Sequence, residues 1–398
     1  MSKTEKPSIR FHGFDDTWEQ RKLGDNIAEY TEKTTINNQY PVLTSSRRGI
    51  FFQTDYYDGN QIASADNTGY NIVPYGYFTY RHMSDDEIFH FNINDITENG
   101  IVSTLYPVFT TDENLDSRYL QYQLNYGKEF AKYAVLQKQG GSRTYMYLNK
   151  LKELRLTIPN FVEEQKKISA YFMKLDNFIT LHQRKFEKLT NVKKLMLEKM
   201  FPQNGSCYPA VRFKGFTGPW ERRKFGDVFE EYSEKNRADL PPLTIIQGSG
   251  TIRRDESERA LQYDKASLSN YKVVNEGDLI VHLRSFEGGL EKANSQGIIS
   301  PAYHTFHGEG VDSRFYYTYF RSKNFIDTDL KPHVYGIRDG RSIDIEGMKT
   351  IEIPFTSYPE QKLIGDAIDS INTLISLQRR EFEKLQSIKK ALLEKMFV

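Results

Sequence analysis

The chain has 398 residues, 38% of them hydrophobic, which is enough material for two separate cores. Its formal net charge of +1 neither favours nor excludes nucleic acid, so a DNA-binding protein of this composition must concentrate its basic residues locally. A single cysteine, Cys207, excludes an internal disulfide and a cysteine-rich metal site. No apolar run has the length of a membrane span or a signal-peptide core, which predicts a cytoplasmic protein without membrane contact.

The first recurring motif follows a short polar start. It reads RFHGFDDTWEQRKLGD at 10–25 and RFKGFTGPWERRKFGD at 212–227, and we call it the opening motif. The only two tryptophans, Trp18 and Trp220, occupy the same position in the two copies, and each is predicted to anchor its motif in a domain core. Similarity on this scale indicates a duplicated unit.

Two middle segments, 41–106 and 243–307, follow the opening motifs and have unrelated sequences. Both contain short β-branched and aromatic runs broken by glycine, asparagine and aspartate. Such runs predict strands and tight turns, without the helices of about 10–15 residues that accompany a parallel sheet. The two halves then converge again on an Asp-Ser-Arg sequence, in which Asp116 and Asp312 are suited to start a helix.

The longest predicted element is also duplicated. A predicted strand ending in Pro159 or Pro354 leads into each copy, and the copies at 163–201 and 360–397 align without a gap, offset by 196 residues (164 with 360). Both lack internal proline and carry apolar residues alternately four and three apart, which is the seam of a helix packing on another long helix. The predicted seam consists of Ile168, Phe172, Leu175, Ile179, Phe186, Leu189, Ile364, Ile368, Ile371, Ile375, Phe382 and Leu385.

A helix with one narrow apolar seam needs a partner, because it is not stable alone in water. Two long helices separated by a whole domain can lie antiparallel and bury each other's seam. The alternative is a parallel coiled coil between two copies of the chain, in which Lys193 and Lys389 would each tend to face their own kind. A helix of about 38 residues extends roughly 57 Å, which suits a spacer.

The order of elements is an opening motif, a variable β-rich domain and a long helix, followed by the same three again. This predicts an α+β fold with two β-rich domains joined by two long antiparallel helices, as an internal pseudo-two-fold repeat. The repeated parts are interpreted as scaffold and the unrelated middles as specificity elements. The predicted boundaries are 1–160 for the first domain, 161–201 for the central helix, 202–211 for a linker, 212–358 for the second domain and 359–398 for the C-terminal helix.

Over essentially its whole length the chain resembles the specificity subunit of a type I restriction–modification enzyme. The resemblance rests on the paired W-E-x-x-K-[LF]-G-D motifs at Trp18 and Trp220 and on the I-P…E-Q-x-x-I joints at Pro159 and Pro354. The E-Q…F-E-K-L…L-E-K-M-F helices complete it. None of these motifs identifies the family by itself. Their occurrence in duplicate and in this order is strong evidence for the resemblance.

The resemblance implies two target-recognition domains, each reading one half of a split double-stranded DNA target, with the helix pair setting the gap. Half-sites one helical turn of DNA apart lie about 34 Å from each other, which a spacer of roughly 57 Å can bridge. The resemblance also implies that the helices dock two methyltransferase (modification) subunits, and that restriction/translocase subunits complete the complex. No cofactor is expected on this chain, whereas S-adenosylmethionine, magnesium and ATP are expected on the partner subunits.

Candidate DNA contacts lie in polar loops of the two middle segments and before the closing strands. Arginine reads guanine edges best, serine and threonine bind phosphates, and glycine lets the backbone approach a phosphate closely. Each of these loops can also be interpreted as a solvated turn. The candidates are Ser45, Ser46, Arg47, Arg48, Arg81, Lys138 and Arg143 in the first half, and Gln247, Ser249, Arg253, Arg254, Arg284, Ser285, Arg338 and Arg341 in the second.

The chain is predicted to be non-catalytic. Neither an adenine-methyltransferase motif with a glycine-rich cofactor loop nor a P-loop is found in the sequence. The carboxylates of 29–33 and 230–235 could suggest a metal nuclease, but they belong to the repeat and are predicted to lie on a solvated helix. His304 and His307 are three residues apart without a third ligand, so no metal site is predicted.

Two other hypotheses remain open. The chain could be a bivalent scaffold that binds two proteins through its variable domains without DNA contact, or an enzyme in its own right. DNA binding through phosphates should weaken steeply with added salt, whereas a mainly apolar protein interface should respond little. Methylation or cleavage of DNA by the purified chain alone would identify an enzyme.

Overall fold

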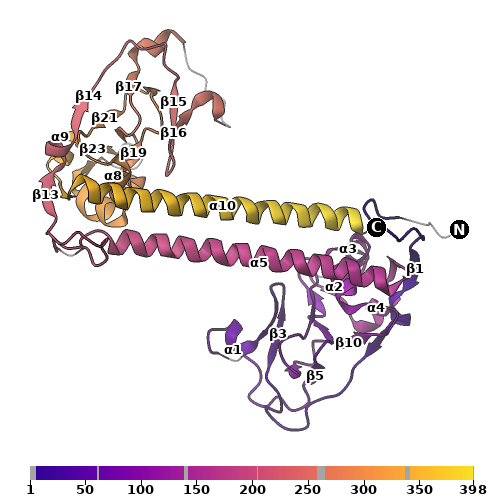
Figure 1. Ribbon diagram of the computed structural model, residues 1–398. Helices are drawn as coiled ribbons and strands as arrows, with labels where there is room; N and C mark the ends of the chain where they lie inside the picture. Colours follow the sequence, from indigo (N-terminus) through magenta and orange to yellow (C-terminus); the bar gives the residue numbers. More distant parts are fainter. Residues whose placement is uncertain are drawn as a thin grey trace. The chain divides into compact units, whose positions relative to one another are not determined.

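The computed structural model describes residues 6–60, 62–138, 142–203, 205–257, 265–336 and 341–397. The chain forms two compact units: unit 1 is Met1–His182 with Glu381–Val398, and unit 2 is Gln183–Arg380. Each unit therefore contains part of each of the two long helices, α5 (Val162–Lys199) and α10 (Tyr358–Met396), which Figure 1 shows. The predicted domain boundaries, which treat the long helices as separate elements, stay a prediction.

Unit 1 combines short strands with small helices. Its strands are β1 (Glu19–Lys22), β2 (Ile27–Glu29), β3 (Leu43–Ser46), β4 (Gly49–Phe52), β5 (Asn71–Pro74), β6 (Phe78–Tyr80), β7 (Met83–Ser84), β8 (Phe91–Ile93), β9 (Asn99–Val102), β10 (Val108–Thr111), β11 (Thr144–Tyr145) and β12 (Arg155–Ile158). Its helices, apart from the long ones, are η1 (Leu23–Asp25), α1 (Gln53–Tyr56), α2 (Ser117–Tyr126), α3 (Lys128–Leu136) and α4 (Leu148–Glu153).

Unit 2 has the same mixture. Its strands are β13 (Glu221–Lys224), β14 (Glu230–Tyr232), β15 (Leu243–Ile246), β16 (Gly250–Arg253), β17 (Lys272–Val274), β18 (Leu279–Val281), β19 (Glu291–Lys292), β20 (Gly297–Ile299), β21 (His304–His307), β22 (Val334–Tyr335), β23 (Ser342–Ile343) and β24 (Glu352–Phe355). Its shorter helices are α6 (Phe225–Val228), η2 (Arg254–Glu256), η3 (Lys265–Asn270), α7 (Ser285–Gly288), α8 (Ser313–Phe320), η4 (Phe325–Leu330), η5 (Lys331–His333) and α9 (Ile345–Lys349).

The two units share one strand arrangement although their middle segments have unrelated sequences. The central antiparallel sheet has the order β2-β10-β6-β8 in unit 1 and β14-β21-β18-β19 in unit 2. Each unit adds a strand pair, β5–β9 or β17–β20, and a hairpin, β3–β4 or β15–β16. The first and last strands of each unit pair as β1–β12 and β13–β24. The predicted α+β class is therefore confirmed, and the strands of these sheets pair antiparallel.

The prediction of a solvated helix for the repeated carboxylate strings is wrong. Glu29 ends strand β2 and Glu230 begins strand β14, and both strands pair antiparallel with a strand of the central sheet. Successive residues of a strand point to opposite faces, so a strand can also expose these carboxylates to solvent. Exposure of a charged string alone does not separate a helix from an edge strand.

The opening motifs meet the long helices through a buried ion pair. In unit 1, Arg10 donates to both carboxylate oxygens of Glu164 near the start of α5, at 2.6 and 2.8 Å. Unit 2 repeats the pair with Arg212 and Glu360, also at 2.6 and 2.8 Å. Glu164 and Glu360 are buried. Removing one partner of such a pair leaves an uncompensated buried charge, so the motif and the helix depend on each other.

The glutamine after each of these glutamates ties the helix to the rest of its unit. The Gln165 amide oxygen accepts from the backbone N–H of Asp116 at 2.8 Å, and its amide nitrogen donates to the Pro159 carbonyl at 3.0 Å. Gln361 accepts from the Asp312 backbone N–H at 3.0 Å. The carboxylates of Asp116 and Asp312 cap α2 and α8, as predicted. The scattered motifs recur because together they build the same joint twice.

The long helices are antiparallel within each unit. The start of α5 shares the core of unit 1 with the end of α10, and the start of α10 shares the core of unit 2 with the end of α5. Trp18 and Trp220 are buried in these two cores, as predicted. The residues of the long helices and their ends in or against the cores are Ile168, Phe172, Leu175, Leu385, Leu392, Leu393, Met396 and Phe397 in unit 1, and Met196, Leu197, Met200, Phe201, Ile364 and Ile368 in unit 2.

The other predicted seam positions are buried or half-buried and alternate with exposed residues along both helices. They are Ile179, Phe186, Leu189, Ile371, Ile375 and Phe382. Their role as a partner-binding or helix-pairing seam stays a prediction. In the described part of the chain, no helix is both long and apolar enough to traverse a lipid bilayer.

Candidate nucleic-acid interface

In unit 1 the candidate residues gather around the tip of hairpin β3–β4. The strands end in the pair Ser46–Gly49, so Arg47 and Arg48 form the tip. Gly49 has a φ of +122°, a conformation that residues with a side chain rarely adopt. The tip borders a hollow of about 250 Å³ that Ser46, Arg47 and Arg81 help to line. The fold thus brings candidates from two separate loops to one place.

An aromatic ring positions the second arginine of the tip. The Arg48 guanidinium lies 4.4 Å from the ring centroid of Tyr56 in α1 and 6.0 Å from that of Phe51 in β4. A guanidinium stacked on a ring keeps its N–H edges free for an acceptor. The two rings therefore hold Arg48 beside the hairpin tip, and its predicted DNA contact stays a prediction.

Three consecutive carboxylates, Asp85, Asp86 and Glu87, hold three of the candidate basic side chains, and we call them the acidic run. They bring together the hairpin tip, the segment after α3 and the segment before β11. The hydrogen bonds from Arg47 hold the pKa of Asp86 well below its usual range, so this carboxylate is ionised at neutral pH. The pairs are Arg47 with Asp86, Arg143 with Asp85 and Lys138 with Glu87.

Arg81 differs from the other basic candidates of unit 1. It directly follows β6, is exposed and lines the hollow beside the hairpin tip. Considering the described residues of the chain, it makes no ion pair. Its guanidinium can therefore meet a phosphate or a guanine edge without first leaving a carboxylate.

Ser45 also lines the hollow, and its predicted DNA contact stays a prediction, but its side chain is engaged within the domain. Ser45 is buried, and its hydroxyl donates to the Thr79 carbonyl at 3.0 Å and accepts from the Asn92 amide at 2.8 Å. The same Asn92 amide donates to the Ser46 carbonyl at 2.9 Å. Ser45 fastens the hairpin to the central sheet, because β3 turns this side chain toward β6 and β8.

In unit 2 the candidates surround the equivalent hairpin, β15–β16. Its strands end in the pair Ile246–Gly250, so residues 247–249 form the tip. The tip borders a hollow of about 900 Å³ lined in part by Gln247, Ser249 and Arg284. The same place in the fold therefore carries a larger hollow with a different set of side chains.

A buried carboxylate fixes this second tip from behind. Glu291 accepts from the backbone N–H groups of Gly248 at 2.7 Å and Gly250 at 3.0 Å. It also accepts from the Tyr317 hydroxyl at 2.9 Å and forms an ion pair with Arg321. Gly250 has a φ of +77°, and a Cβ there would lie 2.6 Å from a backbone oxygen, so the tip requires glycine.

The arginines at the end of β16 are already engaged. Arg253 pairs with Asp255 at the surface at 2.8 Å. Arg254 lies 5.2 Å from the ring centroid of Tyr271 and donates to the Leu243 carbonyl at 3.3 Å. Arg253 can exchange its exposed partner for a phosphate, whereas Arg254 contributes to holding its own domain together.

The two neighbouring candidates after β18 differ in exposure to solvent. Arg284 is exposed, lines the hollow and approaches Glu287 only to 3.9 Å. Ser285 is buried, and its hydroxyl accepts from the backbone N–H of His282 at 2.9 Å. The short helix α7 turns the Ser285 side chain inward, and its predicted DNA contact stays a prediction.

The glycine-containing loop before β23 is described only in part. Arg341 is exposed, and its guanidinium lies 5.7 Å from the ring centroid of Phe286. Arg338 lies outside the described residues, as do residues 139–141 of the corresponding loop in unit 1. The predicted contact of Arg338 stays a prediction.

His282 gives the second hollow a neutral imidazole. Burial, followed by the charge of Arg321, lowers the pKa of His282 to about 4. Its Nδ1 accepts from the backbone N–H of Arg284 at 3.3 Å, which assigns the proton to Nε2. At neutral pH this ring is uncharged, so the positive charge lining the hollow comes from Arg284.

The histidines of β21 form ordinary pairs with carboxylates. His304 lies 2.7 Å from Glu231, and His307 lies 2.8 Å from Asp278. No group of three histidine, cysteine, aspartate or glutamate side chains suited to a metal occurs in the ranges that the structure describes.

Sequence reasoning missed the side chains that hold the two tips. Asn92 is 46 residues from the Ser46 carbonyl that it binds, and Glu291 is 41 residues from Gly250. No motif marks either of them. The acidic run, by contrast, is visible as three consecutive carboxylates, but a charge run is normally read as solvated surface and carries no sign of its partners.

Comparison with known proteins agrees with the geometry. A family model described as the type I restriction modification DNA specificity domain matches residues 15–191. The range contains residues 15–25 of the first opening motif, the hairpin and the hollow of unit 1, and most of α5.

Two curated relatives come from Methanocaldococcus jannaschii. The putative type I restriction enzyme MjaX specificity subunit is 23% identical over 300 residues, which cover 70% of this chain and 67% of the relative. The type I restriction enzyme MjaVIII specificity subunit is 25% identical over 315 residues, covering 74% and 72%. The crystal structure of the type I restriction–modification S subunit from M. genitalium has a similar fold, with a TM-score of 0.58 at 11% identity over 99% of both chains. Taken with the duplicated motifs, these matches show that residues 15–191 carry a type I restriction modification DNA specificity domain and that the chain is similar to type I restriction enzyme specificity subunits.

Proposed function

We propose that this chain is the sequence-specific DNA-recognition subunit of a type I restriction–modification complex. Each unit reads one half of a bipartite double-stranded target with the face formed by its hairpin and hollow. The observation that carries the proposal is the contrast inside the duplication. The scaffold and strand arrangement repeat, whereas the two hollows have different sizes and different linings.

The side chains at each face suit DNA. The tips offer Arg47 and Arg48 in unit 1 and Gln247 and Ser249 in unit 2, and the loops beside them offer Arg81 and Arg284. Arginine binds guanine edges or phosphates, and glutamine pairs with adenine in the major groove. Different side chains on equal frames let the two halves of the target have different sequences.

The chain supplies recognition, and its partners supply the chemistry. The long helices set the gap between the half-sites and dock two methyltransferase subunits, and restriction/translocase subunits complete the complex in the cytoplasm. S-adenosylmethionine, magnesium and ATP are held by those partners. This chain acts without catalysis of its own.

The decisive experiment maps adenine methylation across the genome of a host that expresses this chain with the methyltransferase subunit of its system. The expected result is a split motif with a fixed gap that disappears when this chain is deleted. Unchanged methylation, together with a purified chain that does not bind DNA with a steep salt dependence, would overturn the proposal in favour of a bivalent protein scaffold.

Exchange of one face tests whether the units read independently. Replacing residues 28–150 by the equivalent region of a relative should change one half of the target only. Adding one helical repeat near Asn191 in α5 should alter the gap and leave both half-sites unchanged. A change in both half-sites after the first exchange would contradict independent reading.

A further inference from the structure

Each unit has a pocket at the C-terminal end of one long helix, and we call the two the helix-end pockets. The pocket of unit 2 measures about 380 Å³ and that of unit 1 about 410 Å³. Gln386 and Lys389 of α10 line only the pocket of unit 1, but four lining residues of each pocket correspond, each pair 196 positions apart (194 with 390). They are Lys194, Leu197, Glu198 and Phe201 in unit 2, and Lys390, Leu393, Glu394 and Phe397 in unit 1.

Core packing explains only part of this correspondence. The stretch reads KKLMLEKMF at 193–201 and KKALLEKMF at 389–397. Its methionine and phenylalanine side chains, together with Leu197 and Leu393, pack in or against the two cores, so packing accounts for them. Lys194, Glu198 and their counterparts are exposed and take no part in the two cores. Some exposed positions elsewhere on the helices differ, for example Gln183 against Arg379, whereas others, such as Lys188 and Lys384, are also the same.

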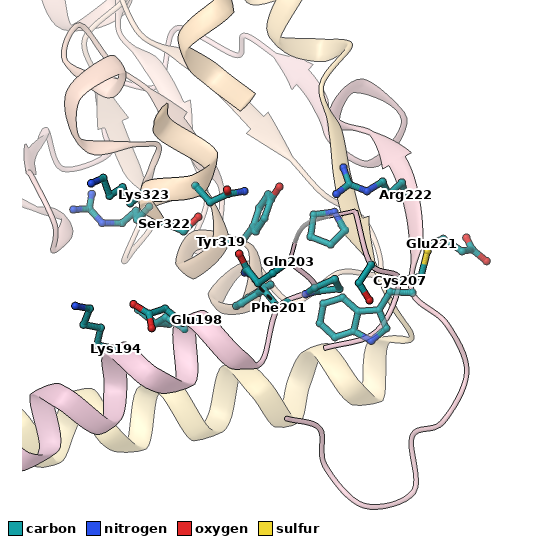
Figure 2. A pocket seen from close by; sticks show the side chains of 17 residues that line it. Lys194, Glu198, Phe201, Gln203, Cys207, Glu221, Arg222, Tyr319, Ser322 and Lys323 are labelled. Carbon is teal, nitrogen blue, oxygen red and sulfur yellow. Dashed lines mark hydrogen bonds between the residues drawn. The ribbon is translucent and has the colours of Figure 1, made fainter. Parts of the chain in front are cut away.

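Apolar surface lies next to charge in both pockets. In unit 2, Lys194 and Glu198 on α5 lie across the pocket from Ser322 and Lys323, with the Tyr319 ring beside them (Figure 2). In unit 1 the opposite wall includes Tyr126, 47% exposed, with Lys128 and Ile179. A segment that fills either pocket would cover apolar side chains and meet a rim of lysines.

The charge left over in both pockets is positive. In unit 2, Arg321 is paired with buried Glu291 and Glu221 with Arg223, which leaves Lys194, Arg222 and Lys323 against Glu198. In unit 1, Lys389 is paired with Asp176, which leaves Lys128 and Lys390 against Glu394. In the described ranges, none of these remaining cations forms an ion pair. Both pockets therefore favour an acidic occupant.

Unit 1 itself displays the chemistry that this helix face accepts. The Lys389 ammonium lies 2.6 Å from the Asp176 carboxylate and 4.6 Å from the ring centroid of Tyr126. Its counterpart Lys193 is half-buried, and the position equivalent to Asp176 is Asn372. Lys389 thus binds a carboxylate beside an aromatic ring, whereas Lys193 has no carboxylate at the equivalent position.

We propose that the helix-end pockets are a matched pair of docking sites, each for the same acidic, apolar-tipped segment of a partner subunit that binds in two copies. An apolar side chain of the segment packs against Leu197 or Leu393, and its carboxylate pairs with Lys194 or Lys390. Two copies are inferred because the chain presents the same four helix-end side chains twice. The inference rests on the proposed function, in which two methyltransferase subunits bind this chain.

Charge reversal at the exposed lysines tests the proposal with little risk to folding. The full chain carrying Lys194→Glu, Lys390→Glu or both is mixed with the methyltransferase subunit of the same system. Stoichiometry is measured by native mass spectrometry and affinity by titration calorimetry. Each single variant is expected to hold one copy normally and to bind the second at least tenfold more weakly. The double variant is expected to lose both copies.

Matched controls come from the same helices. Lys188→Glu and Lys384→Glu reverse exposed lysines that are also 196 positions apart but lie outside both pockets, and they should leave two copies bound. Lysine substitution of the responsible acid in the partner should restore binding to the Lys194→Glu chain. Two copies bound by the double variant with affinity within twofold of the unchanged chain would overturn the inference. An unchanged chain that binds no methyltransferase subunit would instead overturn the proposed function.

Discussion

The two recognition faces have the same frame and hold their hairpins by different means. In unit 1, neutral hydrogen bonds from Ser45 and Asn92 fasten β3–β4 to the sheet, and the ion pairs of the acidic run lie at the surface. In unit 2, one buried carboxylate, Glu291, binds the tip and carries its own ion pair with Arg321. The same fold can therefore carry two unrelated faces, because each hairpin is held by side chains of its own unit.

The difference decides how readily each face can change its contacts. Exposed ion pairs contribute little to stability, so the basic side chains of unit 1 can leave the acidic run for a phosphate at small cost. A buried charge cannot give up its partner cheaply. We expect the basic side chains at the tip of unit 1 to change partners when DNA binds. We expect the tip of unit 2 to bind DNA without changing its conformation.

The largest expected effect is on the stability of unit 2. Glu291→Gln should lower its free energy of unfolding by about 3–5 kcal/mol, because Arg321 loses its charge partner in a buried site. Trp220 fluorescence during urea unfolding, in a Trp18→Phe background, reports on unit 2. Asn92→Ala, followed through Trp18 in a Trp220→Phe background, should cost unit 1 only about 1–3 kcal/mol. Equal losses in the two units would contradict the comparison.

The next effect concerns DNA affinity. Arg81→Ala and Arg284→Ala should each weaken target binding by about 1–3 kcal/mol if the arginine reads a base, with discrimination lost in one half-site only. Binding is measured on duplexes altered in one half-site at a time. A uniform loss with a salt slope smaller by about one would identify a phosphate contact instead. Unchanged binding after Arg81→Ala would remove that residue from the face.

Neutralising the acidic run should tighten binding. Asp85→Asn, Asp86→Asn and Glu87→Gln each remove a negative charge that competes with DNA phosphates, and each should increase affinity for a random-sequence duplex by about fivefold at low salt. Fluorescence anisotropy across a salt series measures this gain. Asp255→Asn in unit 2 frees only Arg253, so it should raise the affinity for the same duplex by about fivefold once. Absence of any gain would show that the acidic run does not compete with DNA.

The smallest expected effect is a pH dependence of the unfolding stability of unit 2. The folded pKa of His282 is about 4, below the ordinary value of about 6.5 in an unfolded chain. Between these values the unfolded state binds more protons, so this group's stabilisation is complete above about pH 6.5 and is lost as pH falls toward 4. The difference in urea midpoint between the unchanged chain and His282→Asn should decrease as the pH is lowered from about 6.5 to about 4. A constant difference would exclude this role of His282.

Local signals made much of the scaffold predictable. The helix starts at Asp116 and Asp312, the burial of Trp18 and Trp220, and the long helices follow from capping residues and apolar spacing. The faces were predictable only as loops. Serine between an apolar run and a charged tip gives no indication of which way it turns, and Ser45 turned inward because β6 and β8 lie behind it.

The sequence by itself determined that the chain is a duplication of opening motif, β-rich segment and long helix, because repeats, caps and periodicity involve neighbouring residues. Only the tertiary structure decided that the unrelated middle segments adopt one strand arrangement, that Glu291 supports one tip, and that the acidic run holds basic side chains from three segments. Those contacts join residues tens of positions apart. They depend on strand pairing and register, which no local pattern in the sequence specifies.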